Sequence, residues 1–289
     1  MVAALRILVD VAVFRLKKLE MANMFAAGAI MLALGLAWGE MAVRFGFGIL
    51  LNLLAYLTND YYDVDQDLSS PNKDHRKARF LKDHMPAALG AQIFLALFLA
   101  ALALAWSPGL LVPLVLGAGI CWVYSWKLKR LPYLDVLAMI AWGVTMPMVG
   151  FPPDSLLGWI LVGQLALFSA CFESIQVIRD YDEDIASGVR TTAVRLGIPA
   201  TNVLLRVFMV LSALYAMLLV QRWAGAVLLL ALFVPLDRTL VSAYWNRQRL
   251  LMGVAWLGLI GWVFWSGSTD GWLAQVGRDA VIEPLAFAR

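Results

Sequence analysis

The chain has 289 residues, 62% of them hydrophobic and only 15% charged, and its mean hydropathy is +0.77. This composition lies outside the range of ordinary soluble domains and predicts a polytopic membrane protein. The net charge is only +3, and the bases lie between apolar segments, so we expect no nucleic-acid partner.

Apolar segments recur along the whole chain. Each is long enough to cross a hydrocarbon layer of roughly 30 Å, which takes about 20 helical residues. We therefore expect an all-α fold, a bundle of about nine transmembrane helices in a single domain over residues 1–289. The expected spans are 21–38, 42–60, 87–106, 109–126, 134–151, 156–178, 201–220, 224–236 and 250–266.

Lysine and arginine gather at alternate ends of these segments. Cytoplasmic loops carry the excess of positive charge, so the N-terminus is expected in the cytoplasm and, after nine spans, the C-terminus on the opposite side. Residues 1–20 are interpreted as a cytoplasmic arm lying in the membrane interface, and residues 267–289 as a tail. The bases are Arg6, Arg15, Lys17, Lys18, Lys73, Arg76, Lys77, Arg79, Lys82, Lys127, Lys129, Arg130, Arg179, Arg190, Arg195, Arg238, Arg247 and Arg249.

A first acidic segment, residues 59–67, reads N-D-Y-Y-D-V-D-Q-D directly after an apolar run. Asp60, Asp63 and Asp67 stand at i, i+3 and i+7, so a continuing helix would carry all three on one face with Asn59 beside them. Three acids on one face repel one another unless a cation binds. Hard oxygen ligands of this kind suit Mg²⁺, which commonly bridges protein carboxylates to substrate phosphates.

A second acidic segment ends the sixth span. Asp180 and Asp184 are four residues apart and share a helical face, with Gln176 near that face one turn earlier. Four spans separate the two segments, so both face the cytoplasm and form an active-site cap. Metal ions would bridge the acids to a diphosphate, and surrounding bases would neutralise its remaining oxygens.

Several polar and basic residues are candidates for substrate binding. The stretch Y-S-W-K-L-K-R ends the fourth span. Taken alone, such a stretch is an interfacial anchor with bases near the lipid head groups. If the acidic segments bind a diphosphate, either Lys127 or Lys129 would contact one of its phosphates. Asn23, near the cytoplasmic end of the first span, is by itself a packing or capping residue. The candidates are Asn23, Asn59, Arg76, Tyr124, Lys127, Lys129, Gln176 and Arg190.

These motifs resemble those of the UbiA superfamily of intramembrane prenyltransferases, and the likeness covers roughly residues 15–265. The pattern N-D-x-x-D-x-x-x-D matches Asn59, Asp60, Asp63 and Asp67, and D-x-x-x-D-x-x-x-G matches Asp180, Asp184 and Gly188. The resemblance implies a nine-helix bundle with a lateral opening to lipid. It also implies that the five aspartates of the two motifs are the catalytic residues and hold Mg²⁺, which helps an allylic diphosphate to ionise. The Y-S-W-K-L-K form looks closer to the lipid and chlorophyll-type branches than to the 4-hydroxybenzoate branch.

The predicted function is Mg²⁺-dependent transfer of an isoprenyl group from a polyprenyl diphosphate to a lipophilic or aromatic acceptor, with membrane lipid as a further partner. One alternative is a terpene cyclase of the same family, which forms its product from the diphosphate without an acceptor. Another is an ion-coupled transporter. That class places ionisable residues near the middle of the membrane, whereas the acids here lie at the ends of spans.

Overall fold

The computed structural model describes residues 2–17, 21–69 and 74–278, and within these ranges the chain is helical, with only isolated β-bridges. The expected all-α fold is confirmed. Lys18, Lys73 and the tail beyond residue 278 lie outside the described residues. The helices are α1 (Val2–Lys17), α2 (Ala22–Leu34), α3 (Trp38–Ser69), α4 (His75–Asp83), α5 (Met85–Trp106), α6 (Leu111–Trp126), α7 (Leu134–Thr145), α8 (Leu156–Arg179), α9 (Tyr181–Ser187), α10 (Thr192–Leu196), α11 (Ile198–Tyr215), α12 (Arg222–Leu228) and α13 (Val241–Ser266).

Six helical segments in the described part of the chain are long and apolar enough to cross a membrane. Three further apolar segments coincide with expected spans but are shorter: Ala22–Leu34, Leu134–Gly150 and Arg222–Phe233. The last of these changes at Leu229 from α-helix to a 3₁₀ turn. The six long segments are Trp38–Ser69, Met85–Trp106, Pro108–Trp126, Leu156–Arg179, Ile198–Val220 and Arg238–Ser266.

Two helices extend beyond the expected spans, because a helix can continue past its run of apolar residues. The span expected at 42–60 is part of α3, which continues to Ser69 and carries the first acidic segment within the helix. The span expected at 250–266 is part of α13, which begins at Val241 and includes the polar residues 246–249. Charged residues at a helix end are compatible with the helix when partners or water satisfy them.

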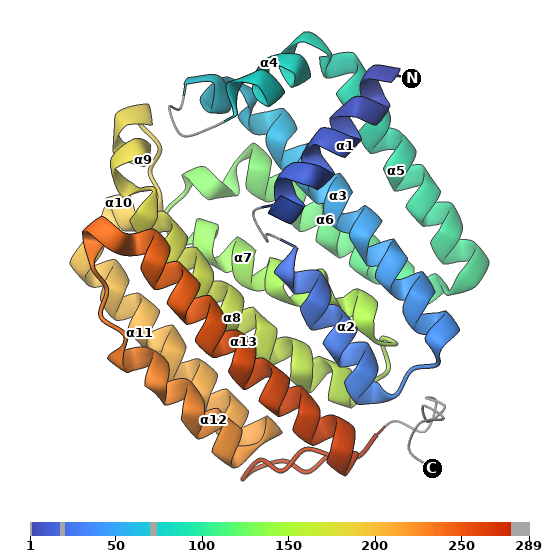
Figure 1. Ribbon diagram of the computed structural model, residues 1–289, viewed down its shortest axis with the longest axis vertical. Helices are drawn as coiled ribbons and strands as arrows, with labels where there is room; N and C mark the ends of the chain where they lie inside the picture. Colours follow the sequence, from blue (N-terminus) through green and yellow to red (C-terminus); the bar gives the residue numbers. More distant parts are fainter. Residues whose placement is uncertain (1, 18–20, 70–73, 279–289) are drawn as a thin grey trace.

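The bundle has two packed cores. One is built mainly by α2, α8, α11 and α13, with Ile30 and Leu161 fully buried; the other is built mainly by α1, α3, α5 and α6, with Phe47 and Leu99 fully buried. Figure 1 shows that the end of α3 with the following α4, and the end of α8 with the following α9, lie at the same end of the bundle. Residues 267–278, which follow α13, lie at the opposite end (Figure 1). The fold therefore carries both acidic segments to one end.

Close packing of α7 on α8 requires a glycine at position 143. A Cβ atom there would lie 2.6 Å from Ser169 Cβ and 2.9 Å from the carbonyl oxygen of Leu165. We expect Gly143→Ala to lower the free energy of unfolding by about 1–3 kcal/mol, because one of the two helices must shift. Gly119→Ala is the matched control, since a Cβ atom there meets no atom within 4 Å. Equal thermal unfolding midpoints for the two purified variants would contradict this packing.

Candidate active site

The first acidic segment forms a continuous helical face at the end of α3. Asp60 and Asp63 are buried and Asp67 is half-buried, as the i, i+3, i+7 spacing predicts. Asp65 points away from this face, is exposed, and pairs with Lys82 at 2.9 Å. The helix therefore separates three inward-facing acids from one outward-facing acid.

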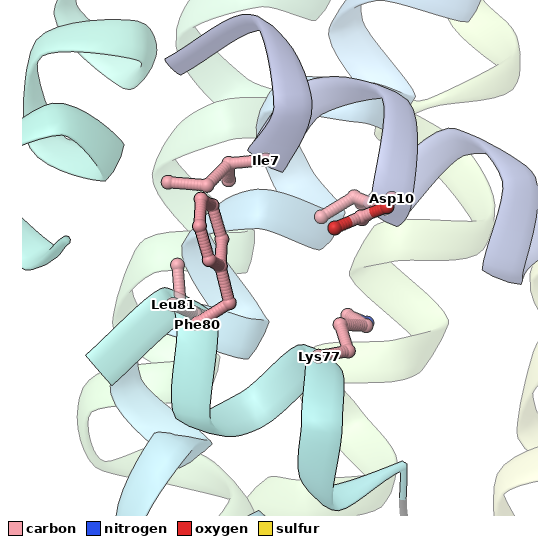
Figure 2. A pocket seen from close by; sticks show the side chains of 6 residues that line it. Ile7, Asp10, Lys77, Phe80 and Leu81 are labelled. Atoms are coloured by element: carbon pink, nitrogen blue, oxygen red, sulfur yellow. The ribbon is translucent and has the colours of Figure 1, made fainter. Parts of the chain in front are cut away.

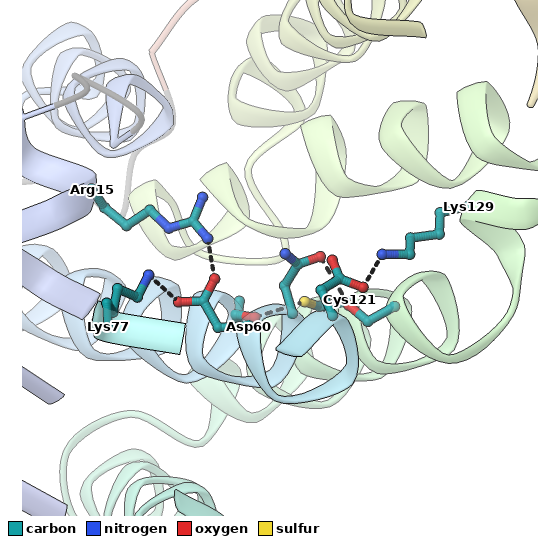
Figure 3. Close-up of polar contacts among 9 residues, drawn as sticks. Arg15, Asp60, Lys77, Cys121 and Lys129 are labelled. Atoms are coloured by element: carbon teal, nitrogen blue, oxygen red, sulfur yellow. Dashed lines mark hydrogen bonds and ion pairs between the residues drawn. The ribbon is translucent and has the colours of Figure 1, made fainter. Parts of the chain in front are cut away.

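Two cations from other helices hold Asp60 (Figure 3). Arg15 of α1 donates from Nη2 to Asp60 Oδ1 at 2.5 Å, and Lys77 Nζ of α4 lies 2.6 Å from Oδ2. Neither base was among the candidate site residues. A signal was present for Arg15, because Ile7, Val11 and Arg15 follow one another at i, i+4 and i+8, which puts this arginine on the buried face of α1.

The structure separates the two candidate lysines that follow Tyr124. Lys129 ion-pairs with Asp63 from the 3₁₀ turn that follows α6 (Figure 3). Lys127 is exposed, and its Nζ lies over the ring of Trp126, 5.9 Å from the centroid. Lys129 is therefore the lysine that reaches the first acidic segment, while Lys127 occupies the position of an interfacial anchor.

The end of α6 joins the two acidic helices. Ser125 Oγ donates to Asn59 Oδ1 of α3 at 3.4 Å, and Tyr124 donates from its hydroxyl to Glu173 Oε1 of α8 at 3.1 Å. These are consecutive residues on one helix. They connect α3 and α8, the two helices that lead into the acidic segments, to neighbouring positions on α6.

The second acidic segment keeps helical spacing across the junction of α8 and α9, because Asp184 N donates to Asp180 O at 2.9 Å. Asp184 is buried and accepts a hydrogen bond from Thr191 Oγ1 at 3.0 Å. Gly188 adopts φ +72°, which ends α9 and turns the chain so that Thr191 returns to Asp184. Asp180 pairs with its neighbour Arg179 at 2.7 Å.

Burial raises the pKa of Asp184 to about 6, against the opposing hydrogen bond from Thr191. The negative charges of Asp180 and Glu183 raise this pKa further, and the positive charge of Lys129 lowers it. Lys129 thus pairs with Asp63 and also acts on Asp184.

A buried acid outside the predicted site, Asp135 of α7, positions the loop after α9. Its carboxylate accepts hydrogen bonds from Thr192 N at 2.6 Å and from the Thr192 hydroxyl, while Thr192 Oγ1 accepts one from Tyr133 N at 2.7 Å. Tyr133 has φ +70°, an uncommon conformation for a residue other than glycine. The sequence signal was an acid at the start of an apolar segment. Asp135 fixes Thr192, and so the adjacent Thr191 that contacts Asp184.

We expect Asp135→Asn to lower the free energy of unfolding by about 1–3 kcal/mol, because the amide brings an N–H₂ donor toward groups that are themselves donors. The diphosphate release predicted from the sequence should fall in the same variant, since Thr191 loses its fixed position beside Asp184. The exposed acid Asp154 supplies the control, Asp154→Asn. Thermal unfolding and a release assay on both variants check this, and matching values would refute the positioning role.

The remaining candidate residues lie farther from these contacts or at the surface. Arg76 is exposed on α4, and Arg190 is exposed between α9 and α10. Asn23 donates to Asn52 Oδ1 at 2.9 Å, and Asn52 lies two turns before Asp60 on α3. Gln176 is half-buried on α8, one turn before Asp180. The structure thus brings Asn59, Tyr124 and Lys129 together and leaves Lys127, Arg76 and Arg190 exposed.

No group of three or more histidine, cysteine, aspartate or glutamate side chains within the described ranges lies close enough to hold a metal ion. Arg15, Lys77 and Lys129 neutralise the carboxylates of Asp60 and Asp63 instead. The donor chemistry nevertheless fits Mg²⁺, because the aspartates and Asn59 offer carboxylate and amide oxygens.

The described part of the chain is a helical bundle with apolar segments of membrane length, which is the architecture of an integral membrane protein. Both acidic segments lie at the same end of this bundle and form a charged site there (Figure 1). Residues 21–252 match the model of the UbiA prenyltransferase family. The chain belongs to this family, which confirms the resemblance drawn from the two motifs.

Comparisons with individual proteins agree with this family assignment. A digeranylgeranylglyceryl phosphate synthase of Pyrococcus horikoshii is 29% identical over 178 residues, which cover 58% of this chain and 60% of that protein. A structure described for digeranylgeranylglyceryl phosphate synthase in membranes has a TM-score of 0.65 at 16% identity, covering 90% of this chain and 99% of that one. A UbiA homologue from Archaeoglobus fulgidus bound to GPP and Mg²⁺ has a TM-score of 0.60 at 16% identity, covering 91% and 98%. At these identities the structures show a shared fold.

Proposed function

We propose that this protein is a Mg²⁺-dependent intramembrane prenyltransferase that moves an isoprenyl group from a polyprenyl diphosphate to a lipophilic acceptor. The observation that carries the proposal is that α3 and α8 both contact the end of α6. Ser125 hydrogen-bonds to Asn59 of α3, and Tyr124 hydrogen-bonds to Glu173 of α8. Lys129, in the turn that follows α6, ion-pairs with Asp63. Contacts from adjacent residues of one helix to both acid-bearing helices support one site built from both. The A. fulgidus homologue, bound to GPP and Mg²⁺, supports the same ligand classes.

In this proposal Asp60, Asp63, Asp67, Asp180 and Asp184 hold Mg²⁺, and Asn59 orients them. The bound metal supplies positive charge that helps the diphosphate leave. Arg15 and Lys129 exchange their carboxylate partners for phosphate oxygens when the donor binds, because charge-assisted hydrogen bonds to phosphate are strong. The remaining candidate residues line the paths by which the substrates reach this site; they are Asn23, Arg76, Tyr124, Gln176 and Arg190.

The prenyl chain would lie below the acids, among aromatic residues. Tyr56 stands one turn before Asp60 on α3, with its ring centroid 6.5 Å from that of Trp142 and 4.5 Å from the guanidinium of Arg15. Such rings exclude water and stabilise positive charge that develops on the allylic carbon.

We propose that the three shorter apolar segments complete nine crossings within a single domain, as the distribution of bases predicts. This topology puts the N-terminus and the active site in the cytoplasm and the C-terminus on the opposite side. The α1 helix supports a cytoplasmic arm, since it reaches the acids at that end through Arg15.

A lipid acceptor is favoured over a small aromatic acid. The P. horikoshii relative is named as a synthase of a glyceryl phosphate lipid, and the Y-S-W-K-L-K stretch at the end of α6 points to the same branch.

The test is to incubate purified protein with Mg²⁺ and diphosphate donors of several chain lengths, with and without membrane lipid extract, and to analyse products by mass spectrometry. We expect diphosphate release and a prenylated product that forms only when extract is present. A product formed from the diphosphate alone would favour the cyclase. Metal-dependent solute uptake into sealed vesicles without diphosphate release would contradict both the prenyltransferase and the cyclase hypotheses.

A further inference from the structure

A second charged cavity lies between α1 and α4, beside the acidic site. Its volume is about 200 Å³. Figure 2 shows a smaller neighbouring pocket at the same interface, where Asp10 projects from α1 and Lys77 from α4, next to the apolar side chains of Ile7, Phe80 and Leu81. The larger cavity is lined by Arg6, Asp10, Val13, Phe14, Lys17, Asp74, Arg76 and Lys77.

The lining carries more positive than negative charge, and its acids are already engaged. Asp10 lies 3.6 Å from Arg6, and Asp74 caps α4 by accepting the backbone N–H groups of Arg76 and Lys77 at 3.1 Å. No ion pair joins Lys17 or Arg76 to any other residue that the structure describes. An anion can therefore neutralise these bases without breaking an existing pair.

Size and surroundings indicate the kind of anion. Pockets that hold whole drug-sized ligands measure roughly 300–1,000 Å³, so a cavity of about 200 Å³ suits a head group and not a prenyl chain. Val13 lines the cavity and is 42% exposed. It belongs to an exposed apolar stripe along α1, on which the hydrocarbon part of a lipid can lie. The stripe consists of Val2, Leu5, Val9, Val13 and Leu16.

We propose that the cavity between α1 and α4 binds the phosphate group of a lipid, as a site separate from the one that takes the donor diphosphate. The two sites meet at Lys77, which lines the cavity and pairs with Asp60. A lipid phosphate that engages Lys77 leaves Asp60 with Arg15 alone, so Asp60 becomes a better ligand for a divalent cation. This last link rests on the proposed function, whereas lipid binding does not.

The test uses full-length protein and native mass spectrometry with dioleoyl phosphatidic acid, and with dioleoylglycerol as the same lipid without phosphate. Lys17→Glu reverses an exposed charge in the cavity, and Arg79→Glu reverses an exposed charge on α4 outside it. We expect wild type and Arg79→Glu to retain phosphatidic acid but not dioleoylglycerol, and Lys17→Glu to bind phosphatidic acid about tenfold more weakly. Equal retention by Lys17→Glu and Arg79→Glu would overturn the site.

Diphosphate release on the same samples tests the proposed function separately. Protein that retains phosphatidic acid but releases no diphosphate contradicts the proposed function and supports the lipid site. Protein that releases diphosphate but binds both lipids equally overturns the lipid site alone.

Kinetics then distinguish the two sources of the phosphate. If it belongs to the acceptor, Lys17→Glu raises KM for a prenylglycerol phosphate and leaves KM for a prenylglycerol unchanged. If it belongs to a bilayer lipid, Lys17→Glu removes stimulation by phosphatidic acid with either acceptor. Each result supports the site, and identical behaviour of Lys17→Glu and Arg79→Glu in both assays overturns it.

Discussion

Replacing Asp184 by asparagine is expected to reduce Mg²⁺-dependent diphosphate release by about 10²- to 10³-fold, the size of effect seen when one preorganised electrostatic group is removed from an active site. The carboxylate is buried and accepts a hydrogen bond from the hydroxyl of Thr191, so the substitution leaves no cation without a partner. Stability should not fall. Burial raises the pKa of this carboxyl, which means that its ionised form destabilises the folded state above about pH 6. An uncharged asparagine removes that penalty.

The matched control is Glu183→Gln, one residue earlier on α9, which is only half-buried. It removes the same charge from the same helix and should keep release within about threefold of wild type, since Glu183 is off the face shared by Asp180 and Asp184. Thermal unfolding must be measured on both proteins. If Asp184→Asn releases diphosphate as fast as Glu183→Gln does, Asp184 is not part of the catalytic site.

Replacing Lys129 by glutamine is expected to lower kcat/KM for the diphosphate donor by about 10²-fold, which corresponds to the loss of a charge-assisted interaction of roughly 2–3 kcal/mol. Lys129 is half-buried and paired with Asp63, so it stands where a phosphate oxygen would be neutralised. Lys127→Gln removes the same charge two residues away, from an exposed side chain over Trp126, and should change kcat/KM by no more than about twofold.

Steady-state kinetics with the two lysine variants in the same lipid or detergent check this expectation. Equal losses would mean that both lysines act through the general surface charge, and a larger loss for Lys127→Gln would reverse the assignment. Substrate affinity and turnover should be separated, because a phosphate-binding lysine affects both.

The geometry of the first acidic segment could be predicted because helical periodicity is a local property. The spacing of Asp60, Asp63 and Asp67 places them on one face as soon as α3 continues past residue 60, and the same spacing turns Asp65 outward. The clustering of both acidic segments at one end could also be predicted, because the four apolar segments expected between them would return the chain to its starting side.

The partners of those acids could not be predicted, because they depend on contacts between distant helices. Arg15 lies 45 residues from Asp60, and nothing in its neighbourhood of the sequence indicates which acid it meets. The 3₁₀ turn after α6 decides between Lys127 and Lys129, and single-sequence reasoning left that choice open. Asp135 and Thr192 are 57 residues apart and belong to no recognised motif.

The central claim is that the two acidic segments form one site for Mg²⁺ and a diphosphate. The most direct measurement is calorimetric binding of a non-reactive thiodiphosphate donor analogue to wild type, Asp63→Asn and Asp184→Asn, with and without Mg²⁺. We predict metal-dependent binding of one analogue per chain in wild type, and its loss in either variant. Binding that persists in each variant with part of the metal retained would show two independent acidic sites and contradict the account.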